Sequence, residues 1–183
     1  MSFITLPGEP ITRPTWALVR ESPAHWIAFF GGAGLARKAP GTAGTLWAWA
    51  SFLLLQKLGF TDTHWALLIG ASLPLGWWAC TATAQRMAVQ DPGSIVFDEV
   101  VAFWLVLWLV MPTGFWGQLI AFGLFRYFDA VKPGPVGWAD QLFHAVNLAQ
   151  DPKGWHKAGF GIILDDLVAA GCTLLVIAIW RFV

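Results

Sequence analysis

The segment GIILDDLVAAGCTLLVIAIWRF, residues 161–182, decides the fold. Apart from the adjacent Asp165 and Asp166 near its start and Arg181 near its end, it is almost entirely apolar over 22 residues. A helix of about 20 apolar residues is long enough to cross the hydrocarbon core of a bilayer. The segment therefore predicts a membrane-spanning helix that carries two acids.

The composition of the whole chain agrees with a membrane protein. Hydrophobic residues make up 57% of the 183 residues and charged residues 12%, whereas soluble domains carry about 25% charged residues. The formal net charge is zero, so the overall balance does not indicate a nucleic-acid partner. The length and composition predict a single integral membrane domain spanning residues 1–183.

Four further apolar runs precede this segment, each bounded by glycine, proline or charged residues. They cover residues 42–59, 64–84, 98–112 and 114–131. We therefore expect an all-α membrane protein with about five transmembrane helices, some shorter than usual.

The stretch from His25 to Ala36 is too short to span a membrane and contains three glycines. It predicts a short N-terminal re-entrant or interfacial helix. Its glycines either expose backbone N–H groups to a ligand or permit close helix packing.

Alternating the five helices across the bilayer places three parts of the chain on one side: the whole segment before the first helix, which begins with the polar residues 1–23, the 85–97 loop and the 132–160 loop. Nine of the eleven Lys and Arg residues then fall on that side. Positive residues favour the cytoplasmic face. The sequence thus predicts that 132–160 is a cytoplasmic loop.

Acidic residues occur at three places within the apolar runs, where an ionised carboxylate costs roughly 2.5–3.5 kcal/mol without a partner. They are Asp98, Glu99, Asp129, Asp165 and Asp166. An oxygen-rich cluster suits a hard cation such as Mg²⁺, so these acids are the candidate catalytic and metal-binding residues. Alternatively, acids that begin a helix, such as Asp98 and Glu99, complement the helix dipole.

Basic residues accompany these acids. Arg126, Asp129 and Lys132 recur at i,i+3 spacing, which places them near one helical face, and Pro133 should end that helix. The two cations either neutralise the acids or bind a phosphate group.

Four motifs on this chain resemble the bacterial phosphatidylglycerophosphatase A family. They are APGTAGT at 39–45, DPGSIVFDE at 91–99, Phe125-Arg126 with Lys132-Pro133, and GFGIILDD at 159–166. The resemblance implies a lipid phosphatase of phospholipid biosynthesis that converts phosphatidylglycerophosphate to phosphatidylglycerol and inorganic phosphate. It would lie in the bacterial inner membrane as a multi-pass protein, with its site facing the cytoplasm.

The resemblance, combined with the charge pattern, gives an expected site with Mg²⁺ as cofactor. We expect the substrate phosphate to be bound by Arg126, Lys132, Arg37, Lys38 and Thr42. The segment between Asp140 and the last acidic motif is longer than is usual in the family, which leaves the role of Asp140 open. The alternative function is a small transporter or ion channel with an acidic cation site, because carboxylates within the membrane also mark ion pathways.

Overall fold

The computed structural model of the chain describes residues 10–144, 148, 151 and 153–182. These residues form helices and no strand, which confirms the all-helical prediction. The helices are α1 (Trp16–Glu21), α2 (Pro23–Ala28), the 3₁₀ helix η1 (Phe30–Leu35), α3 (Pro40–Lys57), α4 (Asp62–Met87), α5 (Phe97–Val110), α6 (Phe115–Val131), α7 (Pro135–His144) and α8 (Gly154–Phe182).

Each of the five apolar runs overlaps one helix, namely α3, α4, α5, α6 or α8. Two helices are long and apolar enough to cross a membrane: α4 and the Gly154–Arg181 part of α8. Helices α3, α5 and α6 have 18, 14 and 17 residues. At about 1.5 Å per residue, they are shorter than the roughly 30 Å of a hydrocarbon core. The structure therefore supports two spans, and the total of five stays a prediction.

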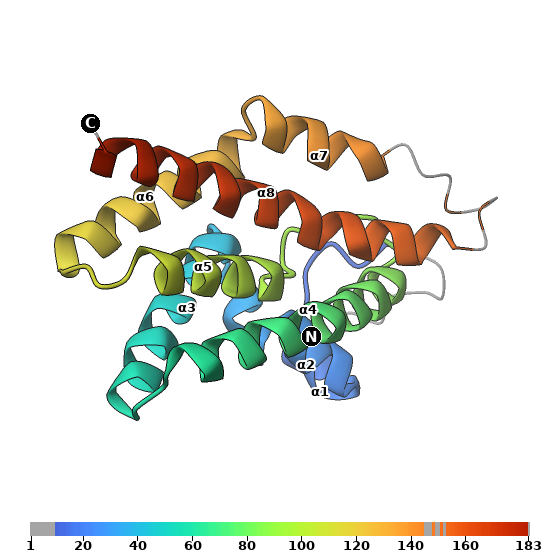
Figure 1. Cartoon of the computed structure of the whole chain (residues 1–183). Helices are drawn as coiled ribbons and strands as arrows, with labels where there is room; N and C mark the ends of the chain where they lie inside the picture. Colours follow the sequence, from blue (N-terminus) through green and yellow to red (C-terminus); the bar gives the residue numbers. More distant parts are fainter. Residues whose placement is uncertain (1–9, 145–147, 149–150, 152, 183) are drawn as a thin grey trace.

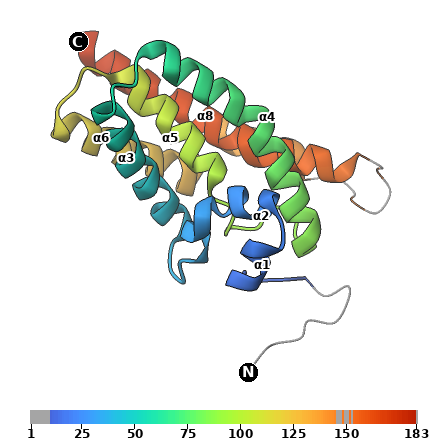
Figure 2. The same ribbon diagram turned by 90° about the horizontal axis from the view of Figure 1, so that it is seen from below.

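Helix α5 is the centre of the bundle, and α3, α4, α6 and α8 all pack against it (Figure 2). Beyond its first turn it consists almost entirely of large apolar residues, and Phe103 and Leu107 are fully buried. Aromatic rings join α5 to its neighbours, for example Phe103 to Phe125 of α6, whose centroids lie 5.5 Å apart. A helix that is apolar on every side is expected at such a central position.

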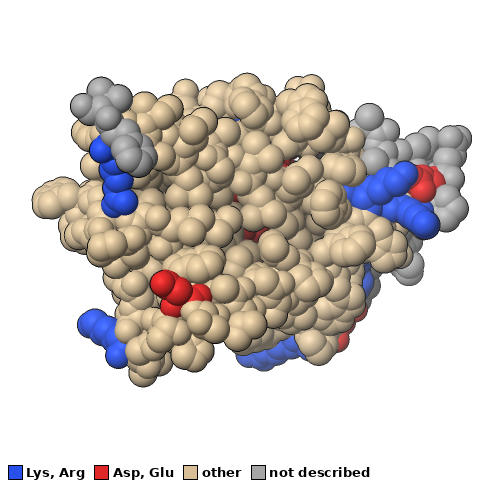
Figure 3. Space-filling view, in the orientation of Figure 1, with Lys and Arg blue, Asp and Glu red and all other residues tan. Residues whose placement is uncertain are grey.

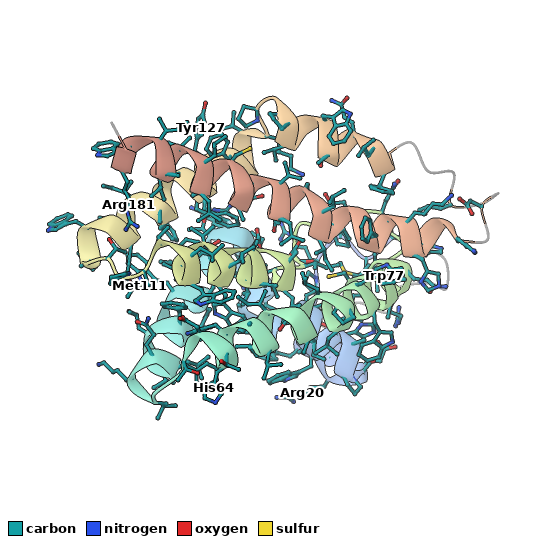
Figure 4. The ribbon with its side chains drawn as sticks, viewed as in Figure 1. Arg20, His64, Trp77, Met111, Tyr127 and Arg181 are labelled. Carbon is teal, nitrogen blue, oxygen red and sulfur yellow. The ribbon has the colours of Figure 1, made fainter. Side chains whose placement is uncertain are left out.

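Helix α8 runs the length of the molecule, with α7 beside its N-terminal half and α6 beside its C-terminal half (Figure 1). Arg181 and Met111 lie at one end of the structure, and Trp77 lies toward the other (Figure 4). Most of the molecular face in Figure 3 is uncharged: its Lys and Arg side chains lie at the edges, one acidic group lies at the lower left, and a few acidic atoms show in hollows near the centre. A wide uncharged band between charged margins is typical of a surface that contacts lipid.

The short glycine-rich stretch forms α2 followed by η1. Gly31 and Gly32 have positive φ values of 63° and 109°, which favour glycine. A Cβ atom on Gly34 would overlap the carbonyl oxygen of Ser94. Of the two alternatives for this stretch, the structure thus favours close packing at Gly34.

Two predicted polar segments contain helices. Helix α1 lies within residues 1–23, of which 1–9 fall outside the described residues, and α7 lies within the 132–160 loop. In that loop, residues 145–147, 149–150 and 152 are not described. The loop thus contributes a helix packed on α8.

One end of each of three helices lies at the same level of the bundle: the first turns of α3 and α5 and the last part of α6. The first turn of α3 lies directly against the first turn of α5. The contact is so close that a Cβ atom on Gly41 would collide with the Glu99 carboxylate. The last part of α6 reaches the same place through Arg126. Helices α4 and α8 continue past this level and remain in contact where Gly159 faces Thr81. The convergence of short helices between two long ones creates the setting for the candidate site.

Candidate active site

Arg126 joins three helices. Its Nη1 atom donates to Glu99 Oε1 of α5 at 3.2 Å, to Asp129 of its own helix and to Thr45 Oγ1 of α3 at 3.4 Å. The Arg126 side chain is 19% exposed, so the guanidinium is largely removed from water. This confirms the expected proximity of Arg126 and Asp129 and adds Glu99 to the pair.

Lys132 makes a second ion-paired group on the other side of the acids. Its ammonium donates to Asp165 Oδ2 of α8 at 2.5 Å and to Asp140 of α7. Burial lowers the pKa of Lys132, but the hydrogen bonds to Asp140 and Asp165 outweigh it and raise the pKa above the ordinary lysine value. Lys132 therefore stays a cation and bridges two helices.

The carboxylates between these two cations are incompletely satisfied. Four carboxylate oxygens in the described part of the chain are buried and have no hydrogen-bond partner: Asp98 Oδ1, Glu99 Oε2, Asp165 Oδ1 and Asp166 Oδ2. Asp166 is 3% exposed and lies within electrostatic range of the other three residues. Buried carboxylate oxygens without partners are costly, so this group has a strong demand for positive charge.

The acids have the donor chemistry of a hard-cation site, because carboxylate oxygens are the ligands that Mg²⁺ prefers. Their arrangement is not closed around one point. Within the described residues, no group of three or more His, Cys, Asp or Glu side chains is placed to hold a metal ion as it stands. The residues thus have the ligand atoms that a hard cation needs, and four of their oxygens have no other partner. To coordinate one cation together, their side chains would have to move.

The first turns of α3 form one side of the site. Gly41 and Gly44 bring the α3 backbone against Glu99, where any larger side chain would overlap the carboxylate or its neighbour Val96. Thr45 is fully buried, and its hydroxyl donates to the Gly41 carbonyl at 2.9 Å. The same hydroxyl oxygen accepts from Arg126, so Thr45 helps to orient the guanidinium.

A small cavity lies beside Asp140 and Asp165, the two acids that bind Lys132. Its volume is about 10 Å³, which is about the space of one water molecule. Its polar lining comes from α7, α8 and the loop that follows α4: Gln90, Asp91, Asp140 and Asp165. The cavity extends the acidic site from α8 toward α7.

The structure brings together most of the site residues expected from the sequence. Those that meet are Asp98, Glu99, Asp129, Asp165, Asp166, Arg126 and Lys132. Thr42 is half-buried in the first turn of α3. Arg37 and Lys38 are exposed in the turn before α3 and are not drawn into the described ion pairs.

The sequence indicated no role for Thr45 and left the role of Asp140 open. Thr45 lies in the APGTAGT motif with the predicted phosphate-binding residue Thr42, and its i,i+4 spacing from Gly41 is the signal that the sequence offers. The local sequence does not indicate the role of Asp140, because its partner Lys132 lies in the preceding turn and the other acceptor of Lys132, Asp165, lies on a distant helix.

The chain matches known proteins over most of its length. It is 34% identical to phosphatidylglycerophosphatase A of Escherichia coli over 153 residues, covering 83% of this chain and 80% of that protein. It is also 34% identical to phosphatidylglycerophosphatase A of Haemophilus influenzae over 157 residues, covering 85% and 87% of the two chains. No solved structure matches. The sequence model of the family described as phosphatidylglycerophosphatase A matches residues 26–181, and the chain therefore belongs to this family.

Proposed function

We propose that this protein is a magnesium-dependent membrane phosphatase that converts phosphatidylglycerophosphate to phosphatidylglycerol and inorganic phosphate. The observation that carries the proposal is the set of four unpartnered carboxylate oxygens between Arg126 and Lys132. A phosphomonoester and its metal ion need acidic ligands and cationic side chains in one place, and this site offers both.

The acids are the residues that would hold magnesium: Asp98, Glu99, Asp129, Asp165 and Asp166. Bound magnesium would offset the phosphate charge and make a water molecule more acidic. The reaction requires water to attack phosphorus while the bond from phosphorus to the glycerol oxygen breaks. Asp166, whose Oδ2 atom has no hydrogen-bond partner, is our candidate to accept a proton from that water, and the leaving glycerol oxygen takes up a proton in turn.

The cations are the residues that would bind the phosphate. Arg126 presents a planar fork that suits two phosphate oxygens, whereas Lys132 acts as a point charge. Both now donate to carboxylates. Substrate binding would redistribute these bonds among phosphate and acids.

The start of α3 completes the proposed phosphate pocket. Thr42 lies in its first turn, where unpaired backbone N–H groups favour an anion. The exposed Arg37 and Lys38 would attract the lipid phosphate from the membrane surface.

The proposed placement is a multi-pass protein of the bacterial inner membrane with the site open to the cytoplasm. Two helices suited to cross a bilayer and the bias of nine cations toward one side support it. The short α3, α5 and α6 would then end near the cytoplasmic headgroups, where the phosphate of a lipid lies. The alternative of a transporter or channel has no support from the family match.

The experiment is phosphate release from phosphatidylglycerophosphate by purified protein in detergent, first with magnesium and then with excess EDTA. We expect release with magnesium and none with EDTA. Asp166→Asn should abolish release. Asp62→Asn should retain it, because Asp62 lies in the first turn of α4, outside the acidic site. Equal release by wild type and Asp166→Asn, or release that persists in EDTA, would refute the proposed site.

A further inference from the structure

The turn between α6 and α7 is built around Lys132. Helix α6 ends at Val131, and Lys132 takes a left-handed conformation with φ of 49°. A non-glycine residue rarely adopts this backbone, so its surroundings must hold it there. Gly134, with φ of 52°, completes the reversal of the chain.

Helix α7 then folds back onto Lys132. A Cβ atom on Gly137 would crowd the Lys132 carbonyl oxygen, so a glycine is needed for this close approach. One turn later Asp140 accepts a hydrogen bond from the Lys132 ammonium. Val136 and Ala139 are both fully buried, and α7 packs on α8. The helix thus carries Asp140 to Lys132 on a rigid support.

The ammonium of Lys132 is shared between two acids on different helices. Its second acceptor is Asp165 Oδ2, at 2.5 Å. The side chains of Lys132, Asp140 and Asp165 are 28%, 21% and 9% exposed, so Asp140 holds the outer side of the ammonium and Asp165 the inner side. The water-sized cavity lies beside the same two acids.

We propose that Asp140 is a positioning residue, which holds the Lys132 ammonium against Asp165 so that Lys132 is in place for the substrate phosphate. This inference rests on the proposed function of the site. The lysine ammonium sits at the end of a flexible four-carbon chain, so it can take many positions. A carboxylate on a packed helix removes that freedom before substrate binds, which lowers the cost of reaching the productive geometry.

The first test does not depend on activity. Purified protein is treated briefly with a small amine-acylating reagent, and the modification of each lysine is read by peptide mass spectrometry. In Asp140→Asn, we expect Lys132 to react several times faster than in wild type, because one of its two anionic acceptors is gone. Unchanged Lys132 reactivity would overturn the proposal, whatever the enzymatic activity.

The chain provides a matched control for this test. Asp151 accepts from Lys157 at 2.6 Å in a more exposed ion pair outside the acidic site. Asp151→Asn should increase the reactivity of Lys157 and leave that of Lys132 unchanged. A rise at Lys132 in this variant too would attribute the effect to general loosening and count against the specific role of Asp140.

The second test uses kinetics with phosphatidylglycerophosphate. Asp140→Asn should lower kcat/KM on the order of tenfold, the value expected for one charge-assisted hydrogen bond, mainly through KM. Asp140→Glu should recover part of it. In a Lys132→Met background, Asp140→Asn should add little further loss; an additional tenfold loss would contradict action through Lys132. If wild type releases no phosphate, the proposed function fails, while the lysine reactivities still test the positioning role.

Discussion

Arg126 of α6 and Glu99 of α5 form an ion pair, with 3.2 Å between Nη1 and Oε1, directly against the backbone of Gly41. The pair joins α5 to α6 through two residues that are 27 positions apart in sequence. Since α3 passes so close, the position of Arg126 depends on the absence of a side chain at residue 41.

Gly41→Ala should therefore damage both stability and activity. The added Cβ atom would overlap the Glu99 carboxylate and crowd Arg126 Nη1, 3.1 Å away. We expect a loss of about 1–3 kcal/mol in the free energy of unfolding, typical of overpacking, and a clear fall in kcat/KM. Denaturation in detergent and phosphate release measure the two effects.

The control is Gly70→Ala in α4, where a Cβ atom meets nothing within 4 Å. In a helix this change should be neutral or slightly stabilising, by up to about 1 kcal/mol. If Gly70→Ala and Gly41→Ala behave alike, the close approach at Gly41 is not what matters.

Removing the charge of Arg126 should separate stability from activity. Arg126→Met leaves Glu99 and Asp129 without their shared cation, and loss of one partner of a buried pair costs about 3 kcal/mol. The triple variant Arg126→Met, Glu99→Gln, Asp129→Asn should regain most of the lost stability, because no unpaired charge remains. It should regain no phosphatase activity. Recovery of activity in the triple variant would show that Arg126 serves only to neutralise the two acids.

Asp166 offers a test of cation binding that does not use activity. In wild type, magnesium should raise the unfolding midpoint, since a ligand that binds the folded state stabilises it. Asp166→Asn removes a buried, unsatisfied carboxylate, so in EDTA it should be at least as stable as wild type. Added magnesium should then shift its midpoint much less. An equal magnesium shift in both proteins would exclude Asp166 as a ligand.

The five apolar helices and the acidic character of the site could be predicted from the sequence, whereas α7 and the pairing of side chains could not. Apolar run length is a local property, so each run predicted one helix. The i,i+3 spacing correctly paired Arg126 with Asp129 but also placed Lys132 on the same face. The structure differs there, because α6 ends at Val131 and Lys132 turns toward Asp165, 33 residues away in sequence. Such pairings depend on how helices pack, which a linear pattern does not contain.

Thr45 illustrates the same limit within a recognised motif. Its neighbour Thr42 occupies the first turn of α3, where a phosphate-binding residue is expected. The helix, however, turns the fully buried Thr45 toward Arg126. Helical spacing shows that Gly41 and Thr45 share a face, but only the position of α5 shows that this face meets the ion pair.

The last prediction concerns acid stability away from the site. His25 of α2 is 4% exposed, and its Nδ1 lies 3.0 Å from Thr83 Oγ1 of α4. Burial lowers the pKa of His25 below its ordinary value, and Arg86 lowers it further, while Glu21 acts in the opposite direction. The folded protein therefore favours the neutral imidazole. Because the unfolded chain binds a proton more readily, the stabilising contribution is complete above about pH 6.5 and is lost as the pH falls below that value.

When the pH is lowered from 7.5 to 5.5, the unfolding temperature of wild type should therefore fall further, or rise less, than that of His25→Gln. The glutamine can still bond to Thr83 but does not titrate in this range. His156→Gln provides the control, because His156 is exposed and its replacement should leave the pH dependence as in wild type. If His25→Gln keeps the full pH dependence, the acid sensitivity arises elsewhere, and the contact between α2 and α4 does not respond to the protonation of His25.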